Sequence, residues 1–155
     1  MQDVKTFGVI GTGIIGAGWA ARALARGFDV LAFDPDSGAE DRLHANLTRV
    51  WPVLERTGLF PGASIERLKF CETLEEVATG AQFIQESAPE RIDLKTRLHA
   101  QIDAAAPENV LIASSTSGLL PSEFQSQCTH PQRVIVGHPF NPVYLLPLVE
   151  VLGGR

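Results

Sequence analysis

The chain has 155 residues, of which 45% are hydrophobic and 20% are charged, so it can form one domain with a packed core. Its formal net charge is −5, and its three lysines lie far apart, at positions 5, 69 and 95. Because nucleic-acid binding needs clustered positive charge, we expect no nucleic-acid partner. There is no apolar run of membrane-spanning length and no visible leader sequence. We therefore expect a cytoplasmic domain without a membrane partner.

The two cysteines, Cys71 and Cys128, are isolated in the sequence. They form no C-x-x-C motif, and no histidine lies at metal-ligand spacing from either of them. We expect two buried, reduced thiols and no metal site.

A glycine-rich turn separates the first predicted strand, 4–10, from the first predicted helix, 14–26. Gly11, Gly13 and Gly16 follow the G-x-G-x-x-G spacing. In this motif the first glycine allows a tight turn, the second lets the backbone approach a pyrophosphate, and the third lets the helix pack closely on the strand. The free N–H groups at the helix start suit a diphosphate. Taken alone, the motif could also be an ordinary glycine-rich turn, so the strand, helix and acidic residue around it decide whether it indicates dinucleotide binding.

A second predicted strand, 29–33, ends in Asp34, eighteen residues beyond Gly16. An acid at this distance binds the adenosine ribose in dinucleotide-binding folds. No arginine follows Asp34 to pair with a 2′-phosphate, so the pattern favours NAD over NADP. The predicted cofactor-binding residues are Asp34 and the turn residues Gly11, Thr12, Gly13, Ile14, Ile15 and Gly16.

Helices and strands alternate along the rest of the chain. The predicted helices are 39–57, 74–79, 89–106 and 121–127, and Pro52 is expected to bend or restart the first of these after Val50. The predicted strands are 67–72, 81–86, 109–114, 133–137 and 148–152. This alternation predicts an α/β fold of the Rossmann type, a doubly wound, mostly parallel sheet with helices on both faces. We expect the first strand near the centre and the cofactor across the carboxyl ends of the strands.

Arg42, Arg49 and Arg56 recur every seven residues on the predicted helix 39–57. Acidic residues are interleaved with them, which favours a solvated helix face. The alternative is an anion-binding rim over the substrate cleft.

Polar residues follow three of the predicted strands, at the sheet edge where their carboxyl ends meet. They are Glu86, Glu90 and Lys95, then 114–117, then His138 and Asn141, and Glu150 on the last strand lies twelve residues beyond His138. A histidine oriented by a carboxylate can take a proton from a hydroxyl group. From spacing alone, His138 could equally be a loop histidine bonded to backbone, and Glu150 a strand-edge acid. His44, His99 and His130 are weaker candidates, the first two as helix-face residues.

The run Gly-His-Pro-Phe-Asn-Pro-Val-Tyr-Leu-Leu-Pro-Leu-Val-Glu-Val, 137–151, resembles the signature of the 3-hydroxyacyl-CoA dehydrogenase superfamily. The resemblance extends over essentially the whole chain and identifies it with the NAD-binding N-terminal domain. It implies that His138 is the catalytic base, Glu150 its partner, and Ser117, twenty-one residues before His138, the group that binds the reacting oxygen. It also implies that Glu90 and Lys95 contact NAD and that Asn141 lies near cofactor and substrate.

Two further segments, Gln85–Arg91 and Ser114–Phe124, make the resemblance greatest to superfamily members that oxidise the 3-hydroxyl group of L-carnitine. The alternatives are a 3-hydroxyacyl-CoA substrate and, in a different class, an NAD-binding module without catalysis. Segment 39–68 contains no lysine, which disfavours a CoA nucleotide, although its arginines leave that alternative open. Candidate aromatic contacts for a trimethylammonium group are Trp51, Phe140 and Tyr144, each of which could equally pack in the core.

In the superfamily a helical C-terminal domain follows the last strand and completes both the active site and a homodimer. The resemblance therefore implies that residues 1–155 form the NAD-binding domain and that a substrate and dimerisation domain lies beyond them.

Overall fold

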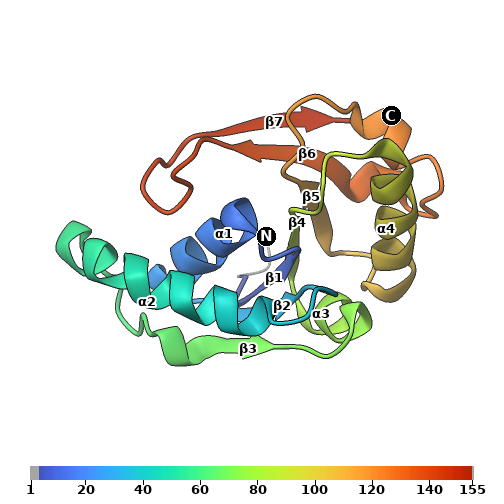
Figure 1. Cartoon of the computed structure of the whole chain (residues 1–155). Coiled ribbons are helices and arrows are strands. Elements are labelled where there is room, and N and C mark those ends of the chain that lie inside the picture. Colours follow the sequence, from blue (N-terminus) through green and yellow to red (C-terminus); the bar gives the residue numbers. More distant parts are fainter. Residues whose placement is uncertain (1–3, 155) are drawn as a thin grey trace.

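The computed structural model describes residues 4–154, so Arg155 and residues 1–3 of the predicted domain lie outside the described part. Within this described part, seven strands form one sheet in the order β3-β2-β1-β4-β5-β6-β7 (Figure 1). The strands are β1 (Thr6–Ile10), β2 (Asp29–Phe33), β3 (Leu68–Phe70), β4 (Phe83–Glu86), β5 (Leu111–Ser114), β6 (Val134–Pro139) and β7 (Val149–Gly153). All neighbouring pairs are parallel except β6 and β7, which are antiparallel.

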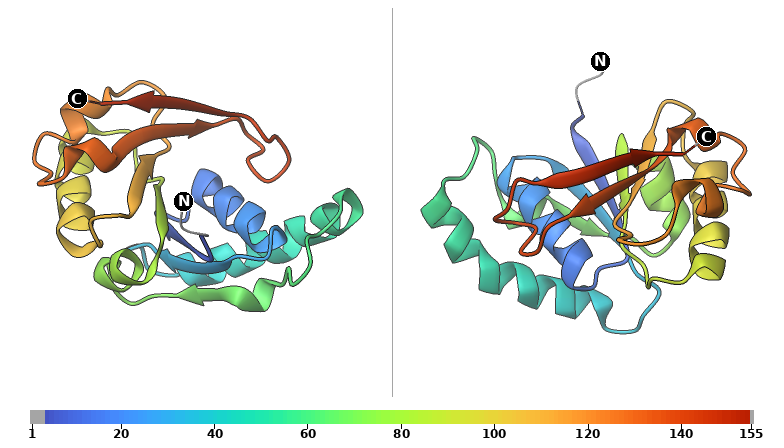
Figure 2. Two further views of the ribbon diagram at one scale, coloured as in Figure 1. Left: turned by 180° about the vertical axis from the view of Figure 1, so that it is seen from behind. Right: turned by 90° about the horizontal axis from the view of Figure 1, so that it is seen from above.

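The helices cover both faces of the sheet, as Figures 1 and 2 show. One face packs against α1 (Ile14–Ala25) and α2 (Ala39–Thr57), and the other against α3 (Leu74–Gly80), α4 (Ile92–Ala105) and α5 (Pro121–Phe124). Short 3₁₀ turns precede β3 at Ile65–Arg67 and β6 at Pro131–Arg133. The predicted doubly wound, mostly parallel fold is confirmed.

The sheet residues alternate between two apolar cores, as expected for strands covered on both faces. In β1, Val9 packs into the core beneath α1 and α2, whereas Ile10 packs into the core beneath α3, α4 and α5. β1 has a parallel neighbour on each side, in the register Ile10↔Phe33 and Ile10↔Glu86. The carboxyl ends of β1, β2 and β4 therefore lie side by side at one edge, where the predicted cofactor residues follow them.

Helix α2 has the predicted bounds and continues through Pro52, so the predicted restart of the helix after Val50 does not occur. Proline removes one helical hydrogen bond, but Pro52 lies on the exposed side of the helix. The fully buried Leu47 and Leu54 flank it on the opposite side. Packing of this apolar face holds the helix together across the proline.

Two boundaries near the site also differ from the prediction. Helix α4 begins at Ile92 rather than Pro89, because Glu90 remains in the loop with its carboxylate bonded to the segment after β5. His138 and Pro139, predicted in a loop, are the last residues of β6. Pairing with β7 extends β6, in the register His138↔Glu150 and Pro139↔Val149.

Candidate functional site

The glycine turn after β1 has the geometry that its spacing predicts. Gly11 has φ +88°, in the left-handed region, and a Cβ there would lie 2.8 Å from the Ser87 backbone. A Cβ at Gly16 would lie 1.8 Å from the Gly11 carbonyl oxygen, so α1 packs directly on the turn. A Cβ at Gly13, in contrast, would meet no atom of the described residues within 4 Å. That open space at the start of α1 fits the approach of a dinucleotide pyrophosphate.

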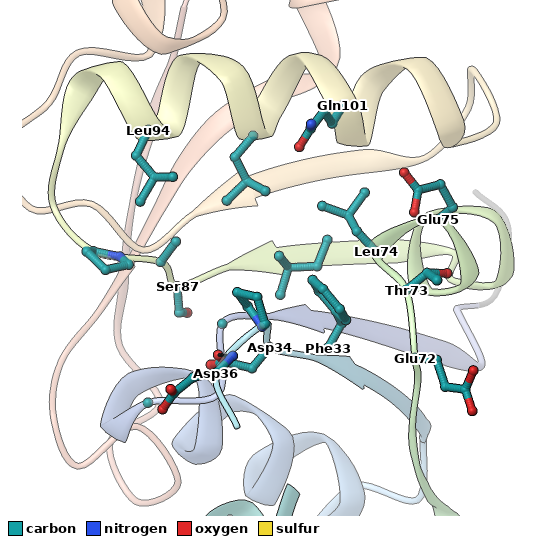
Figure 3. Close-up of a pocket in the computed structure, with 17 residues that line it drawn as sticks. Phe33, Asp34, Asp36, Glu72, Thr73, Leu74, Glu75, Ser87, Leu94 and Gln101 are labelled. Atoms are coloured by element: carbon teal, nitrogen blue, oxygen red, sulfur yellow. Dashed lines mark hydrogen bonds between the residues drawn. The ribbon is translucent and has the colours of Figure 1, made fainter. Parts of the chain in front are cut away.

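Asp34 ties the end of β2 to this turn. Its Oδ2 accepts hydrogen bonds from the Thr12 backbone N–H (2.7 Å) and the Thr12 hydroxyl (3.2 Å), and its Oδ1 accepts one from the Asp36 N–H (3.0 Å). The carboxylate still lines the cleft beside the turn (Figure 3). Asp34 is thus held in place at the predicted ribose position.

Two cavities meet at Ser87 and Ala88, just after β4. The larger has a volume of about 890 Å³ and is bordered by the turn residues Gly11 and Gly13 and by Asp34. The smaller has a volume of about 330 Å³ and is lined by Ile15, Ser87, Ala88, Glu90, Ser115, Ser117, His138 and Pro139. The first suits the adenosine half of a dinucleotide, and the second contains the predicted base.

His138 and Glu150 form the predicted pair. His138 Nδ1 lies 2.9 Å from Glu150 Oε2, across the β6–β7 ladder that places the two residues opposite each other. The imidazole is 26% exposed and borders the smaller cavity. A carboxylate at Nδ1 leaves Nε2 as the ring nitrogen that can receive a proton from a ligand.

Glu90 organises the segment after β5. Its Oε1 accepts hydrogen bonds from the Thr116 hydroxyl and from the backbone N–H groups of Ser117 (3.0 Å) and Gly118 (3.1 Å). Burial raises the pKa of Glu90, but these three hydrogen bonds and the Lys95 charge outweigh it, so the pKa is below its ordinary value. Ser117 is exposed and borders the same cavity as His138, so the structure brings these two predicted site residues together.

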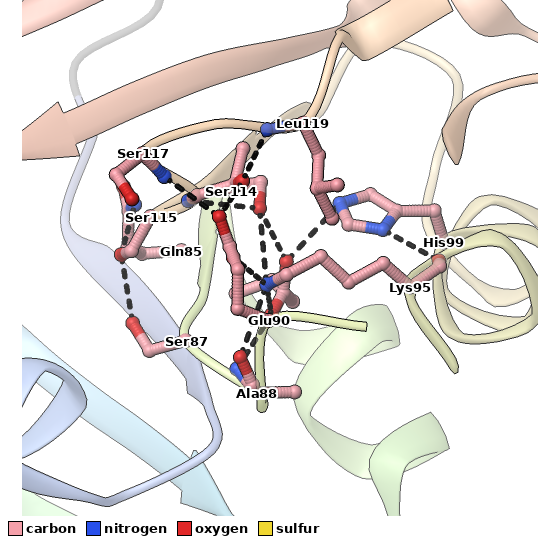
Figure 4. Close-up of polar contacts among 12 residues, drawn as sticks. Gln85, Ser87, Ala88, Glu90, Lys95, His99, Ser114, Ser115, Ser117 and Leu119 are labelled. Atoms are coloured by element: carbon pink, nitrogen blue, oxygen red, sulfur yellow. Dashed lines mark hydrogen bonds and ion pairs between the residues drawn. The ribbon is translucent and has the colours of Figure 1, made fainter. Parts of the chain in front are cut away.

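Lys95 is buried rather than exposed at the cleft, with 1% of its side chain accessible. Its Nζ donates to Glu86 Oε1 (2.7 Å), to the Ala88 carbonyl oxygen (3.0 Å) and to Ser114 Oγ (3.5 Å), and lies 3.8 Å from Glu90 Oε2 (Figure 4). The ammonium group therefore joins the ends of β4 and β5. Its direct contact with NAD stays a prediction, and in this arrangement it supports the loops that line both cavities.

His99 lies on the same buried face of α4, one turn after Lys95, and is fully buried. Its Nδ1 lies 2.8 Å from the Lys95 carbonyl oxygen, which can only accept, so Nδ1 carries the proton. Nε2 has no hydrogen-bond partner in the described part of the chain and lies 3.6 Å from Glu86 Oε2. Burial lowers the pKa of His99, against the opposing effect of Glu86. His99 lies on a helix face, as predicted, but this face of α4 is the buried one.

Asn141 is not in the cavity of His138. It borders a small separate pocket of about 60 Å³, whose other lining residues are Ile14, Ala17, Gly18, Asn46, Arg49, Val50 and Tyr144. The connection between β6 and β7 reaches over α1 here (Figure 1), where a Cβ at Gly18 would lie 2.9 Å from Val143 Cβ.

Two of the periodic arginines on α2 have polar partners nearby: Arg42 pairs with Asp36, and Arg49 Nη2 donates to Asn46 Oδ1 (2.7 Å). At least two of the three periodic arginines are thus engaged within α2 and its entry turn.

Ser115 lies in the predicted polar run 114–117, whereas its partners Gln85, Ser87 and Trp19 were not singled out as site residues in the sequence. Gln85, Ser87 and Ser115 form one hydrogen-bonded group with Trp19 of α1. The available signal was the polar run 85–87 at the end of an otherwise apolar strand, followed by the serine-rich run after the next strand.

Cys71 and Cys128 are both free thiols, as predicted. Cys71 is buried, whereas Cys128 is partly exposed, and burial with the nearby Asp103 charge raises the pKa of Cys128 to about 11. Among residues 4–154, no group of three or more His, Cys, Asp or Glu side chains could hold a metal ion. No helix within these residues is long and apolar enough to cross a membrane.

The family model for the 3-hydroxyacyl-CoA dehydrogenase NAD binding domain matches residues 6–155, and the chain belongs to this family. NAD is therefore the cofactor, as the glycine turn and Asp34 predict. The open Gly13, the long cleft and the placed carboxylate of Asp34 fit that dinucleotide.

Two groups of known proteins resemble the chain. The L-carnitine dehydrogenase of Pseudomonas putida is 62% identical over 154 residues, which are 99% of this chain and 48% of that protein. The L-carnitine dehydrogenase of Streptomyces griseus is 54% identical over 153 residues, 99% of this chain and 46% of that protein. The crystal structure of 3-hydroxybutyryl-CoA dehydrogenase from Escherichia coli has a TM-score of 0.82 and 31% identity, and covers 97% of this chain and 32% of that one. The chain thus spans about half the length of the curated relatives that it matches.

Proposed function

We propose that this domain serves an NAD-dependent dehydrogenase that oxidises the 3-hydroxyl group of L-carnitine to a ketone. The observation that carries the catalytic part is the His138–Glu150 pair, whose histidine borders the smaller cavity next to the dinucleotide cleft. The substrate is inferred from relatives named L-carnitine dehydrogenase that are 62% and 54% identical. A module that only binds NAD would have no use for a histidine oriented in this way.

In the proposed reaction, His138 Nε2 takes the hydroxyl proton as the C3–H bond breaks. Glu150 keeps the imidazole oriented through Nδ1 and stabilises the imidazolium that forms. The Ser117 hydroxyl, on the loop that Glu90 holds, donates to the reacting oxygen. NAD, when bound, supplies the hydride acceptor. Glu90 and Lys95 keep the loops after β4 and β5 in register around the cofactor.

Phe140 is the aromatic residue that we propose for the trimethylammonium group. Its ring centroid lies 5.7 Å from that of His138, and 37% of the residue is exposed. A quaternary ammonium has no N–H to donate, so an aromatic face is its natural contact, at about 0.5–2 kcal/mol. Tyr144 and Trp51, the other two candidates, pack against the core beneath α1 and α2, which disfavours them.

A 3-hydroxyacyl-CoA is the second candidate substrate, since the family description and the Escherichia coli structure both name such enzymes. A CoA nucleotide would need accessible cations. Arg42 and Arg49 are exposed, but they bond to Asp36 and Asn46, so a CoA nucleotide would have to replace these contacts, which favours the smaller substrate.

We also propose that a further domain completes the substrate cleft and forms a homodimer. Every residue of β7 is exposed, and the exposed apolar residues Leu145, Leu146, Leu148, Val149, Val151 and Leu152 lie on it or just before it. An exposed apolar edge strand of this kind is normally covered by another segment. Relatives about twice as long as this chain support that arrangement.

The test is NAD reduction by the full-length protein with L-carnitine, 3-hydroxybutyrate and 3-hydroxybutyryl-CoA as substrates. We expect the highest kcat/KM with L-carnitine. A higher value with the CoA thioester would replace the proposed substrate by an acyl-CoA. Absence of turnover with all three, despite NAD binding, would favour the non-catalytic module.

A further inference from the structure

The Ser115 hydroxyl is the meeting point of three polar side chains from three elements. Gln85 Nε2 at the end of β4 lies 2.8 Å from Ser115 Oγ, and Trp19 Nε1 of α1 lies 3.3 Å from it. The third neighbour is the Ser87 hydroxyl, with its Oγ 2.8 Å away (Figure 4). Ser87 and Ser115 both border the cavity of His138, and Ser87 also borders the larger cleft.

The direction of each hydrogen bond follows from donor chemistry. Gln85 Nε2 also lies 3.0 Å from the Gly137 carbonyl oxygen, which can only accept, so this end of the amide is the NH₂ group. The Trp19 indole N–H can only donate. Ser115 Oγ therefore accepts from both Gln85 and Trp19, which occupies both of its lone pairs.

Ser115 must then donate its own proton to Ser87 Oγ. As a result, the Ser87 proton points away from Ser115 and needs another acceptor. No other partner for this hydroxyl is present within residues 4–154. Ser87 borders both cavities, of which the larger is also lined by Asp34 and the smaller by His138.

We propose that Ser87 is a cofactor-orienting donor, which gives its hydroxyl proton to an oxygen of NAD between the AMP half and the nicotinamide ring, on the second phosphate or on the ribose that this phosphate carries. Trp19 and Gln85 act through Ser115 to fix the direction of this proton. Because Gln85 also holds the Gly137 carbonyl, the same group connects the cofactor contact with the strand that carries His138. This inference rests on NAD binding and does not depend on which substrate is oxidised.

The first test measures the dissociation constants of AMP, ADP-ribose and NAD by calorimetry, with the full-length protein and its Ser87→Ala variant. One neutral hydrogen bond corresponds to about a 2- to 10-fold change in affinity. We expect weaker binding of ADP-ribose and NAD by that factor and unchanged binding of AMP, which lacks the contacted region. Ser126→Ala, an exposed serine outside both cavities, is the matched control.

Two results would overturn the assignment to Ser87. Unchanged affinity for ADP-ribose and NAD would show that its hydroxyl does not contact the cofactor. An equal loss for AMP would place the effect on the adenosine side. Both results come from binding measurements without turnover. They can therefore be interpreted even if L-carnitine is not the substrate.

The second test uses Ser115→Ala and addresses the Ser115 relay, by which we mean the hydrogen bonds from Trp19 and Gln85 to Ser115 and from Ser115 to Ser87. Loss of the Ser115 hydroxyl removes the acceptor of Trp19 and one of the two acceptors of Gln85, and it frees the Ser87 proton to turn. We expect weaker ADP-ribose binding with unchanged AMP binding, together with a lower melting temperature. Unchanged ADP-ribose affinity in Ser115→Ala would refute the relay.

Discussion

Replacing Lys95 by methionine tests whether this residue is a buried structural cation or a direct NAD contact. Methionine keeps the approximate length of the side chain but removes the ammonium, which makes three hydrogen bonds in a site that is 1% exposed. The Glu86 carboxylate, 0% exposed, would lose its counter-charge. Removing one partner of a buried ion pair destabilises a protein by about 3–5 kcal/mol. For a chain of this size, that corresponds to a melting temperature lower by about 6–20 °C.

Calorimetric melting without ligand is the assay, and Lys69→Met is the matched control. Lys69 pairs with Glu76, and their side chains are 66% and 41% exposed, so we expect the loss of this pair to change stability by less than about 1 kcal/mol. The double variant Glu86→Gln/Lys95→Met should recover much of the stability, because no unpaired charge remains buried. If Lys95→Met melted like Lys69→Met but bound NAD poorly, Lys95 would be a cofactor contact and the structural reasoning would be wrong.

Three further predictions concern the cofactor turn and the buried histidine. Asp34→Ala should weaken NAD binding in calorimetry by roughly tenfold to a hundredfold, the value of a charged hydrogen bond, and a native preference for NADP would contradict the assignment. Gly13→Ala should melt normally but bind NAD poorly, whereas Gly16→Ala should melt at a lower temperature because its Cβ overlaps the Gly11 carbonyl; equal melting of the two variants would refute this contrast. Burial lowers the pKa of His99, so the unfolded chain binds its proton more readily and stability falls as the pH drops below about 6.5, by up to about 1.4 kcal/mol per unit. Denaturant titrations between pH 5 and 7 give the free energy of unfolding as a function of pH. This dependence should be weaker in His99→Phe, and an unchanged dependence would exclude His99 as its source.

The fold and the outline of the site could be predicted from the sequence because their signals are local. The alternation of strands and helices defines the sheet, and the glycine spacing with Asp34 defines the cofactor cleft. The His138–Glu150 contact was also within reach, since twelve residues suffice for a tight return of the chain. The geometry of this contact could not be predicted, because it depends on the antiparallel pairing with β7 that extends β6 to include His138.

The remaining part of the site depends on contacts between distant segments. Lys95 and His99 lie one turn apart on α4, and only packing against the ends of β4 and β5 makes that polar face the internal one. The Ser115 relay joins residues 96 and 30 positions apart, which no local pattern connects. Helix α2 is a further example. The sequence predicts that the helix bends or restarts near Pro52, but buried leucines on the opposite side keep it continuous.

The most direct test of the proposed chemistry is the rate of NAD reduction by the His138→Ala variant of the full-length protein, measured together with its NAD affinity. Loss of a general base should lower the rate by about 10²–10⁴ while the dissociation constant of NAD stays nearly unchanged. Glu150→Gln should slow the reaction as well, because Nδ1 would lose its charged partner. Near-normal turnover in His138→Ala would contradict the account, because the proton would then have to go to another group.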